Sequence, residues 1–387
     1  MSVTAARGFV ASGVHSGIRR LGPDLAVVRS TARAVGAAVW TTNRVLAAPV
    51  VVSKRHLDAA EPQAVVINAG VANAATGETG IADAELTAAE TASALGLRPE
   101  EVVVLSTGVI GVPLPMDRVL AGVREASVAL APDGGEGAAT AILTTDRWPK
   151  QATVEGDGFV VGGMAKGAGM IHPRLATMLA VVTTDYPVAP GEPIDFLRPA
   201  VDASFNRISV DGECSTNDAV LLLANGASGI ERTAARDAQL AVALGEVCAA
   251  LAREIVADGE GATVLLEIAV SGAASTEEAE AVARRIATSP LVKTAAFGRD
   301  PNWGRVLAAA GSAPWNGGFA RVETDRLSMS FDGAPVFVRG EPTGATPALG
   351  GSAVSIDLDL GLGDGSASYL ASDLTVDYVR LNAEYTS

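Results

Sequence analysis

Residues 162–185 read GGMAKGAGMIHPRLATMLAVVTTD, and this stretch carries the strongest signals for both fold and chemistry. The short apolar runs at 159–161 and 178–182 are typical of strands. The glycines between them surround one lysine, Lys166, and leave room for backbone amides to approach a ligand. The G-x-x-x-x-G-K-[ST] order of a phosphate-binding loop is absent, so a turn with a solvated lysine is the alternative interpretation.

Strand and helix patterns extend outward from this stretch to both ends of the chain. Helices are predicted at 83–95, with Asp83 as N-cap and Gly96 as the stop, and at 116–130, 237–257, 276–287 and 301–310. Strands are predicted at 25–28, 37–40, 50–52, 64–67, 101–105, 264–270, 328–331, 355–358 and 367–371. Glycine-rich segments at 134–137, 226–229 and 340–351 are expected to be loops or a domain join. Strict β–α alternation is absent, so the pattern predicts a mixed α/β fold of packed sheets and helices.

Composition excludes several classes of function. The net charge of -15 disfavours binding to nucleic acid or to anionic membranes. The two cysteines, Cys214 and Cys248, form neither a disulfide framework nor a C-x-x-C zinc motif, and His15, His56 and His172 show no metal-ligand spacing. With no secretory-type start and no apolar run of about 18 residues, the protein is expected to be cytoplasmic.

Thr177 stands in the otherwise apolar segment 175–182. One interpretation is a core threonine that is hydrogen-bonded to the backbone. The other is self-cleavage, in which the hydroxyl attacks the carbonyl of Ala176 and hydrolysis of the resulting ester leaves Thr177 as a new N-terminus. Its α-amine, with a reference pKa of about 7.7–8.0, can then act as the base for its own hydroxyl.

Two further segments carry polar groups where a ligand could be bound. Thr107 and Gly108 follow the predicted strand 101–105, where a hydroxyl and backbone N–H groups can donate to an oxyanion, although an ordinary turn is equally consistent. Glu260 lies between two glycines after a predicted helix, and it is either a surface-loop residue or part of a pocket for an ammonium group. Segment 299–305 (RDPNWGR) has the residues of a helix start.

In this order, the segments resemble the glutamate N-acetyltransferase (ornithine acetyltransferase) family of arginine biosynthesis across nearly the whole chain. The matching segments are 68–77 (NAGVANAATG), 106–111 (STGVIG), 143–150 (LTTDRWPK), 162–185, 204–218 (SFNRISVDGECSTND), 258–263 (DGEGAT), 289–305 (SPLVKTAAFGRDPNWGR) and 378–387 (YVRLNAEYTS). The resemblance implies an α/β sandwich that looks like N-terminal-nucleophile hydrolases but is wired differently.

The resemblance also implies an activity and its residues. Autocatalytic cleavage between Ala176 and Thr177 would give an alpha chain, 1–176, and a beta chain, 177–387. Thr177 would carry an acetyl group from N2-acetyl-L-ornithine to L-glutamate, with Thr107 and Gly108 stabilising the oxyanion. The implied substrate-binding residues are Thr144, Lys166, Thr177, Glu260, Asn382 and Ser387.

The same resemblance implies two alpha and two beta chains, no cofactor and no metal, and acetyl-CoA as a candidate second donor. Two other functions stay open on the sequence. One is an N-terminal-nucleophile aminopeptidase or amidohydrolase on the related fold. The other is a binding protein in which Thr177 is inert and uncut.

Overall fold

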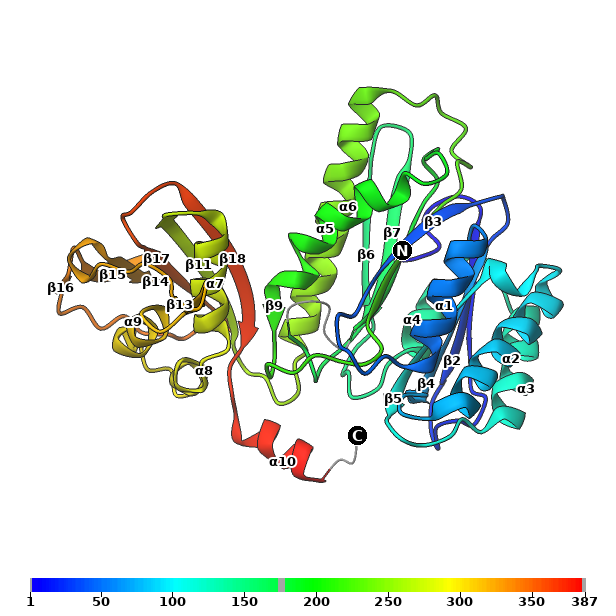
Figure 1. Cartoon of the computed structure of the whole chain (residues 1–387), viewed down its shortest axis with the longest axis horizontal. Helices are drawn as coiled ribbons and strands as arrows, with labels where there is room; N and C mark the ends of the chain where they lie inside the picture. The colour runs from blue at the N-terminus through cyan, green and yellow to red at the C-terminus, as the bar shows by residue number, and fades with distance from the viewer. Residues whose placement is uncertain (1, 173–177, 385–387) are drawn as a thin grey trace. The chain divides into compact units, whose positions relative to one another are not determined.

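The computed structural model describes residues 2–172 and 178–384. They form two compact units, which are treated separately below. Unit 1 comprises Met1–Asn206 and Glu213–Ile255, and unit 2 comprises Arg207–Gly212 and Val256–Tyr385. In Figure 1, the colours of unit 1 run from blue to green, and most of unit 2 is yellow to red. None of the helices in the described ranges is long and apolar enough to cross a membrane.

Unit 1 contains two sheets that share one core. The first has the order β1 (Phe9–Val14), β2 (Leu25–Ser30), β4 (Ala64–Val71) and β5 (Val102–Val109). The second has the order β3 (Val35–Trp40), β10 (Ala219–Ala224), β8 (Leu179–Thr184), β7 (Val160–Lys166) and β6 (Lys150–Glu155). Ile67 and Leu105 of the first sheet and Met164, Val181 and Leu221 of the second belong to the same buried cluster.

Helices cover the outer faces of these sheets. Helices α2 (Gly77–Leu95) and α3 (Met116–Val128) pack on the first sheet, and α5 (Pro193–Asp202) packs on β3 and β10. A third helix, α6 (Ala234–Ala257), brings Val247 and Leu251 against Gly163 of β7. Strands β4, β5, β8 and β10 are buried along nearly their whole length, which explains why they are nearly continuous apolar runs. The prediction of a mixed α/β sandwich is confirmed for this unit.

Two sequence predictions in unit 1 are wrong. Residues 50–52 lie in helix α1 (Ala48–Ala59), which has Pro49 as its second residue and covers the edge strand β5. Ser53 Oγ accepts the Val104 N–H and donates to the Val104 carbonyl oxygen, each at 2.8 Å. Gly135 and Gly137, from the segment expected to be a loop, lie in helix α4 (Gly135–Ala141). The local patterns could not reveal that these segments pack against sheet edges and faces.

The limits of helix α2 are also only partly as predicted. The helix begins at Gly77, so Asp83 lies inside it and is not its N-cap. Gly96 ends the helix in the left-handed conformation, with φ of 68°, which confirms the predicted stop.

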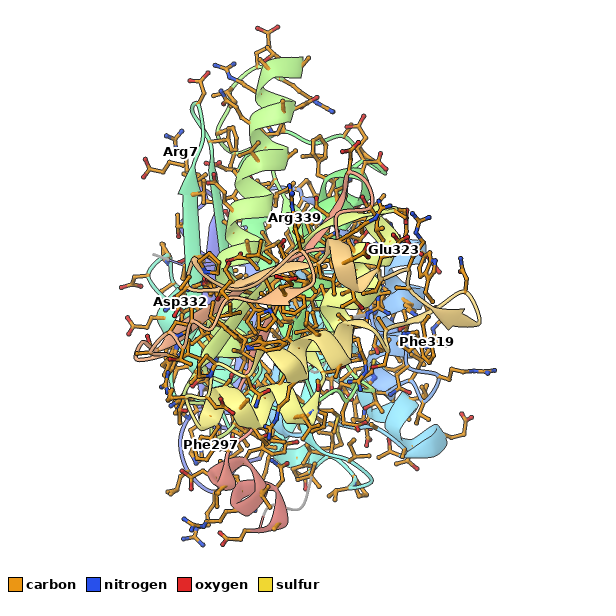
Figure 2. All side chains as sticks on the ribbon, turned by 90° about the vertical axis from the view of Figure 1, so that its left-hand side faces the viewer. Arg7, Phe297, Phe319, Glu323, Asp332 and Arg339 are labelled. Carbon is orange, nitrogen blue, oxygen red and sulfur yellow. The ribbon has the colours of Figure 1, made fainter. Side chains whose placement is uncertain are left out.

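Unit 2 is built on one seven-stranded sheet. Its order is β16 (Glu341–Pro342), β15 (Ala334–Val338), β14 (Ser328–Phe331), β17 (Ala353–Asp359), β11 (Leu265–Ala273), β18 (Gly365–Ser372) and β9 (Ile208–Ser209). Strands β14 and β15 join through Asp332 and Gly333, both at positive φ, and Arg339 follows β15 at φ 47° (Figure 2).

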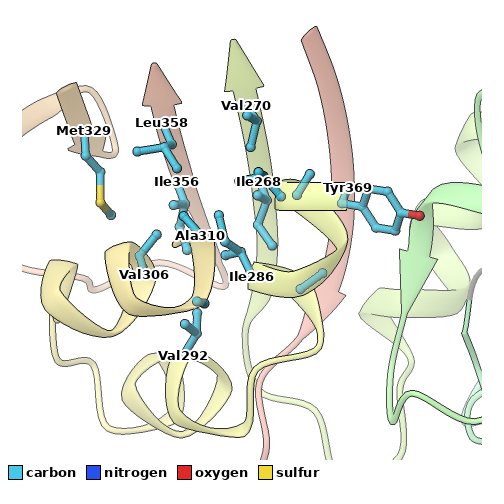
Figure 3. Close-up of a cluster of buried hydrophobic side chains, with 14 of the residues drawn as sticks. Ile268, Val270, Ile286, Val292, Val306, Ala310, Met329, Ile356, Leu358 and Tyr369 are labelled. Atoms are coloured by element: carbon cyan, nitrogen blue, oxygen red, sulfur yellow. The ribbon is translucent and has the colours of Figure 1, made fainter. Parts of the chain in front are cut away.

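Three helices bury one face of this sheet. They are α7 (Thr276–Ala287), α8 (Pro290–Phe297) and α9 (Trp303–Ala310), and their side chains join Ile268, Val270, Ile356 and Leu358 in one cluster (Figure 3). Strand β17 shows the alternation of buried and less buried residues that one covered face requires. The last helix of the unit, α10 (Val376–Glu384), follows β18.

Candidate active site

The predicted oxyanion residues lie at the end of β5, where its pairing with β4 is irregular. Gly108 is opposite Gly70, and the register shifts between Gly70 and Val71. Gly108 has φ of 131°, and a Cβ atom there would come within 2.2–2.6 Å of backbone atoms of Gly70 and Val71. Only glycine fits this close approach, so the position of the Thr107–Gly108 peptide is fixed by backbone packing.

Side-chain hydrogen bonds hold the same strand end in place. Ser106 Oγ donates to Asn68 Oδ1 at 2.5 Å. Asn217 Nδ2 donates to the carbonyl oxygens of Ser106 and Ala72 at 2.8 and 2.7 Å. Because these groups are buried and paired, the strand end is rigid, as a preorganised oxyanion site requires.

Lys166 meets Thr107 although the two residues are 59 positions apart in the chain. Its Nζ donates to Thr107 Oγ1 at 3.2 Å, and Lys166 and Thr107 are 2% and 3% exposed. Lys166 ends strand β7 and is buried, so the alternative of a turn with a solvated lysine is wrong. The structure thus unites two of the predicted residues in unit 1.

Asp146 links Thr144 to Gly167, the residue that follows Lys166. Its Oδ2 accepts the Thr144 N–H at 3.0 Å, and its Oδ1 accepts the Gly167 N–H at 2.6 Å and Lys150 Nζ at 2.7 Å. Burial alone would raise the pKa of Asp146, but the charges of Lys166 and Lys150 and the hydrogen bonds outweigh burial and hold it well below its usual range. Asp146 is therefore ionised and balances one of two buried lysine charges.

The predicted cleavage site lies in the connection between β7 and β8. These strands are antiparallel, and Lys166 pairs with Leu179 at the end of their ladder. Ala176 and Thr177 themselves lie outside the described residues. Met178 is described, and its N–H donates to Asp218 Oδ1 at 2.8 Å.

Asp218 is a fully buried carboxyl group directly before β10. Burial raises the pKa of Asp218 well above its usual range, and the Met178 N–H, the Lys166 charge and Ser215 offset only part of this effect. Two carboxyl groups thus feel the charge of Lys166, and the fold moves their pKa values in opposite directions.

In unit 2, the structure brings Glu260 and Asn382 together. Asn382 Nδ2 donates to Glu260 Oε2 at 2.9 Å across 122 positions of sequence. Gly261 allows this meeting, because a Cβ atom there would lie 2.4 Å from the Tyr378 nitrogen. Thr375 Oγ1 also donates to the Gly261 carbonyl oxygen at 2.8 Å. Ser387, the remaining predicted contact, lies outside the described residues.

Three residues at the site had no predicted role: Asp146, Asn217 and Asp218. All three lie in segments that carry the family resemblance, LTTDRWPK and SFNRISVDGECSTND. The segments could be recognised in the sequence, but the contacts that these three residues make could not be predicted from it. No cluster of three or more His, Cys, Asp or Glu side chains that could hold a metal occurs within residues 2–172 and 178–384.

Comparison with known proteins assigns the family. Residues 10–387 match the family model that is described as "ArgJ family". The chain belongs to the ArgJ family. Two ArgJ relatives, each named arginine biosynthesis bifunctional protein ArgJ, are 48% identical to it. The one from Symbiobacterium thermophilum aligns over 99% of this chain and 98% of its own length. The one from Mycolicibacterium paratuberculosis aligns over 100% and 96%.

The chain is also similar to a solved structure of an ornithine acetyltransferase from Mycobacterium tuberculosis in complex with ornithine. The two chains are 43% identical where they align. The alignment covers 44% of this chain and 94% of the Mycobacterium tuberculosis chain, with a TM-score of 0.42. The assignment to the ArgJ family rests on the full-length sequence matches.

Proposed function

We propose that this protein transfers the acetyl group of N2-acetyl-L-ornithine to L-glutamate in arginine biosynthesis, through an acetyl ester on Thr177. Membership of the ArgJ family supports the pathway, and the ornithine bound to a relative supports the substrate. The observation that supports the chemistry most strongly is the buried hydrogen bond from Lys166 to Thr107, beside Gly108.

Each proposed role follows from the chemistry of the group. The carbonyl oxygen of the acetyl group becomes negative as Thr177 Oγ attacks, and the hydroxyl of Thr107 and the N–H of Gly108 are donors suited to it. Lys166 supplies a positive charge that can pair with a substrate carboxylate. Thr144, held by Asp146 in the same unit, contributes a further hydroxyl.

Glu260 and Asn382 are proposed to bind the side-chain ammonium group of ornithine. The amide of Asn382 holds one carboxylate oxygen of Glu260 and leaves the other oxygen able to accept from an ammonium group. Ser387 is proposed as a further contact on the basis of the family resemblance alone. Ornithine leaves after the acetyl transfer and glutamate enters, so the cycle is of the ping-pong type.

Self-cleavage between Ala176 and Thr177 is proposed to give the alpha chain, 1–176, and the beta chain, 177–387. The strand order supports their continued association, because β10 and β8 of the beta chain lie between β3 and β7 of the alpha chain. A cut in the β7–β8 connection would leave these ladders of hydrogen bonds intact. An assembly of two alpha and two beta chains and a cytoplasmic location complete the proposal.

The test is a comparison of donors and acceptors with purified protein. Incubation with acetylornithine and glutamate should yield ornithine and N-acetylglutamate in equal amounts, with the parallel double-reciprocal lines of a ping-pong mechanism. Release of acetate without acetylglutamate would indicate a hydrolase instead. Replacing acetylornithine by acetyl-CoA tests the second activity, which the word "bifunctional" in the names of the relatives supports.

A further inference from the structure

Glu260 and Asn382 belong to a closed ring of hydrogen bonds in unit 2. Thr375 Oγ1 donates to the Gly261 carbonyl oxygen at 2.8 Å and accepts the Tyr378 N–H at 3.0 Å. Asn382 Nδ2 donates to the Tyr378 carbonyl oxygen at 3.1 Å and to Glu260 Oε2 at 2.9 Å. Because Glu260 and Gly261 are neighbours in the chain, the bond between Asn382 and Glu260 closes the ring.

Thr375 makes two bonds of different kinds in this ring. It directly precedes α10, and by accepting the Tyr378 N–H it caps the first turn of that helix. Capping uses the hydroxyl oxygen only as an acceptor. The bond donated to Gly261 instead joins α10 to the loop that carries Glu260. Thr375 is 4% exposed, so water competes little for either bond.

Backbone packing at Gly261 keeps this loop against the start of α10. Gly261 has φ of 67°, and a Cβ atom there would lie 2.8 Å from Thr375 Oγ1 and 2.9 Å from the Asp377 carbonyl carbon. Only glycine fits an approach this close. A displacement of the start of α10 would therefore also displace the peptide that follows Glu260.

A buried polar group attaches the same loop at a second point. Asp373 accepts the Thr263 N–H at 2.9 Å and the Thr263 hydroxyl at 2.5 Å. Next to Asp373, the carbonyl and hydroxyl oxygens of Ser372 accept from Nζ of Lys293, a residue of α8 that is 4% exposed. Burial lowers the pKa of Lys293 to about 8, although the charge of Asp373 opposes this effect. The segment that follows Glu260 is thus anchored to the residues that lead into α10.

We propose that Thr375 is a positioning residue for the ammonium-binding pair: its hydroxyl holds Gly261 to the start of α10 and so keeps the Glu260 carboxylate where Asn382 and the ornithine ammonium group both reach it. This inference rests on the proposed function. Glutamate has no side-chain ammonium group, so Thr375 should matter for ornithine and acetylornithine and much less for glutamate. The ammonium group is at the far end of acetylornithine from the acetamide that reacts, so the effect should fall on binding and not on turnover.

The test compares three threonine variants of the full chain. Thr375→Val keeps the shape of the side chain and removes both hydrogen bonds, and Thr375→Ser restores the hydroxyl. Thr343→Val is the matched control, because the Thr343 hydroxyl in the same unit also donates to a carbonyl oxygen, that of Pro335, at 2.8 Å and accepts an N–H, that of Ala345, at 3.2 Å. If Thr375→Val does not fold, Thr375→Gly takes its place, since glycine is well tolerated at an N-cap but cannot donate to Gly261.

Two measurements separate positioning from simple packing. Titration calorimetry should give Thr375→Val a dissociation constant for ornithine about fivefold higher than that of wild type, and the Michaelis constant for acetylornithine should rise equally. The turnover number and the Michaelis constant for glutamate should change less than about twofold, and Thr375→Ser and Thr343→Val should stay within about twofold of wild type throughout. In a Glu260→Gln background, Thr375→Val should weaken ornithine binding less than about twofold further, because both changes disable the same contact.

Unchanged ornithine binding in Thr375→Val would overturn the inference alone, provided that wild type binds ornithine. Equal losses for acetylornithine and glutamate, a serine variant as impaired as the valine variant, or a full fivefold loss in the Glu260→Gln background would overturn it too, because each would indicate a general disturbance of unit 2. A wild-type protein that binds no ornithine would contradict the proposed function, and this inference with it.

Discussion

The buried ion pair between Asp146 and Lys150 gives a prediction that can be worked out from the structure. Both side chains are completely shielded from solvent, and Asp146 also accepts the N–H groups of Thr144 and Gly167. Asp146→Asn removes the negative charge and leaves the charges of Lys150 and Lys166 buried close together. Breaking a buried pair of this kind costs about 3–5 kcal/mol.

For a unit of this size, 1 kcal/mol shifts the unfolding midpoint by about 2–4 °C, so Asp146→Asn should lower the midpoint by roughly 6–20 °C. The assay is differential scanning calorimetry at pH 7. The control is Asp157→Asn, which breaks the exposed pair between Asp157 and Arg236 and should cost less than about 1 kcal/mol. Equal midpoints for the two variants would refute the reasoning.

The same pair predicts the pH dependence of stability. The folded state holds the pKa of Asp146 below its unfolded value of about 3.9, so the folded state binds this proton less readily than the unfolded state. The stabilisation from ionised Asp146 is therefore fully present above about pH 5 and is lost as the pH falls below about 4. Wild type should lose this contribution on acidification, and Asp146→Asn, which lacks it at pH 7, should show a smaller decline in midpoint between pH 5 and pH 3.

Three further predictions concern the chemistry. Thr177→Ala should remain a single chain by intact mass, and a cut at the Ala176–Thr177 bond in that variant would exclude Thr177 as the cleaving group. Thr107→Ala should lower the turnover number by about a hundredfold or more, since it removes one oxyanion donor, and an unchanged turnover number would remove Thr107 from the mechanism. Glu260→Gln should raise the Michaelis constant for acetylornithine about tenfold, because a charged hydrogen bond contributes about 1.5–3 kcal/mol. Its effect on glutamate, which has no side-chain ammonium, should be smaller, and equal losses for both substrates would mean that Glu260 does not bind the ammonium group.

The sequence by itself determined the class of fold and the segments that carry the chemistry. The strand pattern identified β14 at 328–331, and the helix pattern identified α7 at 276–287. Both have the limits that the structure has. Local patterns suffice there because strand and helix periods are properties of consecutive residues. They failed at 50–52, where a valine run typical of a strand follows Pro49 and instead forms α1 over the edge of β5.

Only the tertiary structure decided which of the predicted site residues contact one another. Thr107 and Lys166 come from different sheets, and Glu260 and Asn382 are 122 positions apart, so no local pattern can express either contact. The same holds for Asp146 and Asp218, which read as ordinary acidic residues in sequence. Their ionisation depends on burial and on the charge of Lys166, and both are set by the packing of strands distant in the chain.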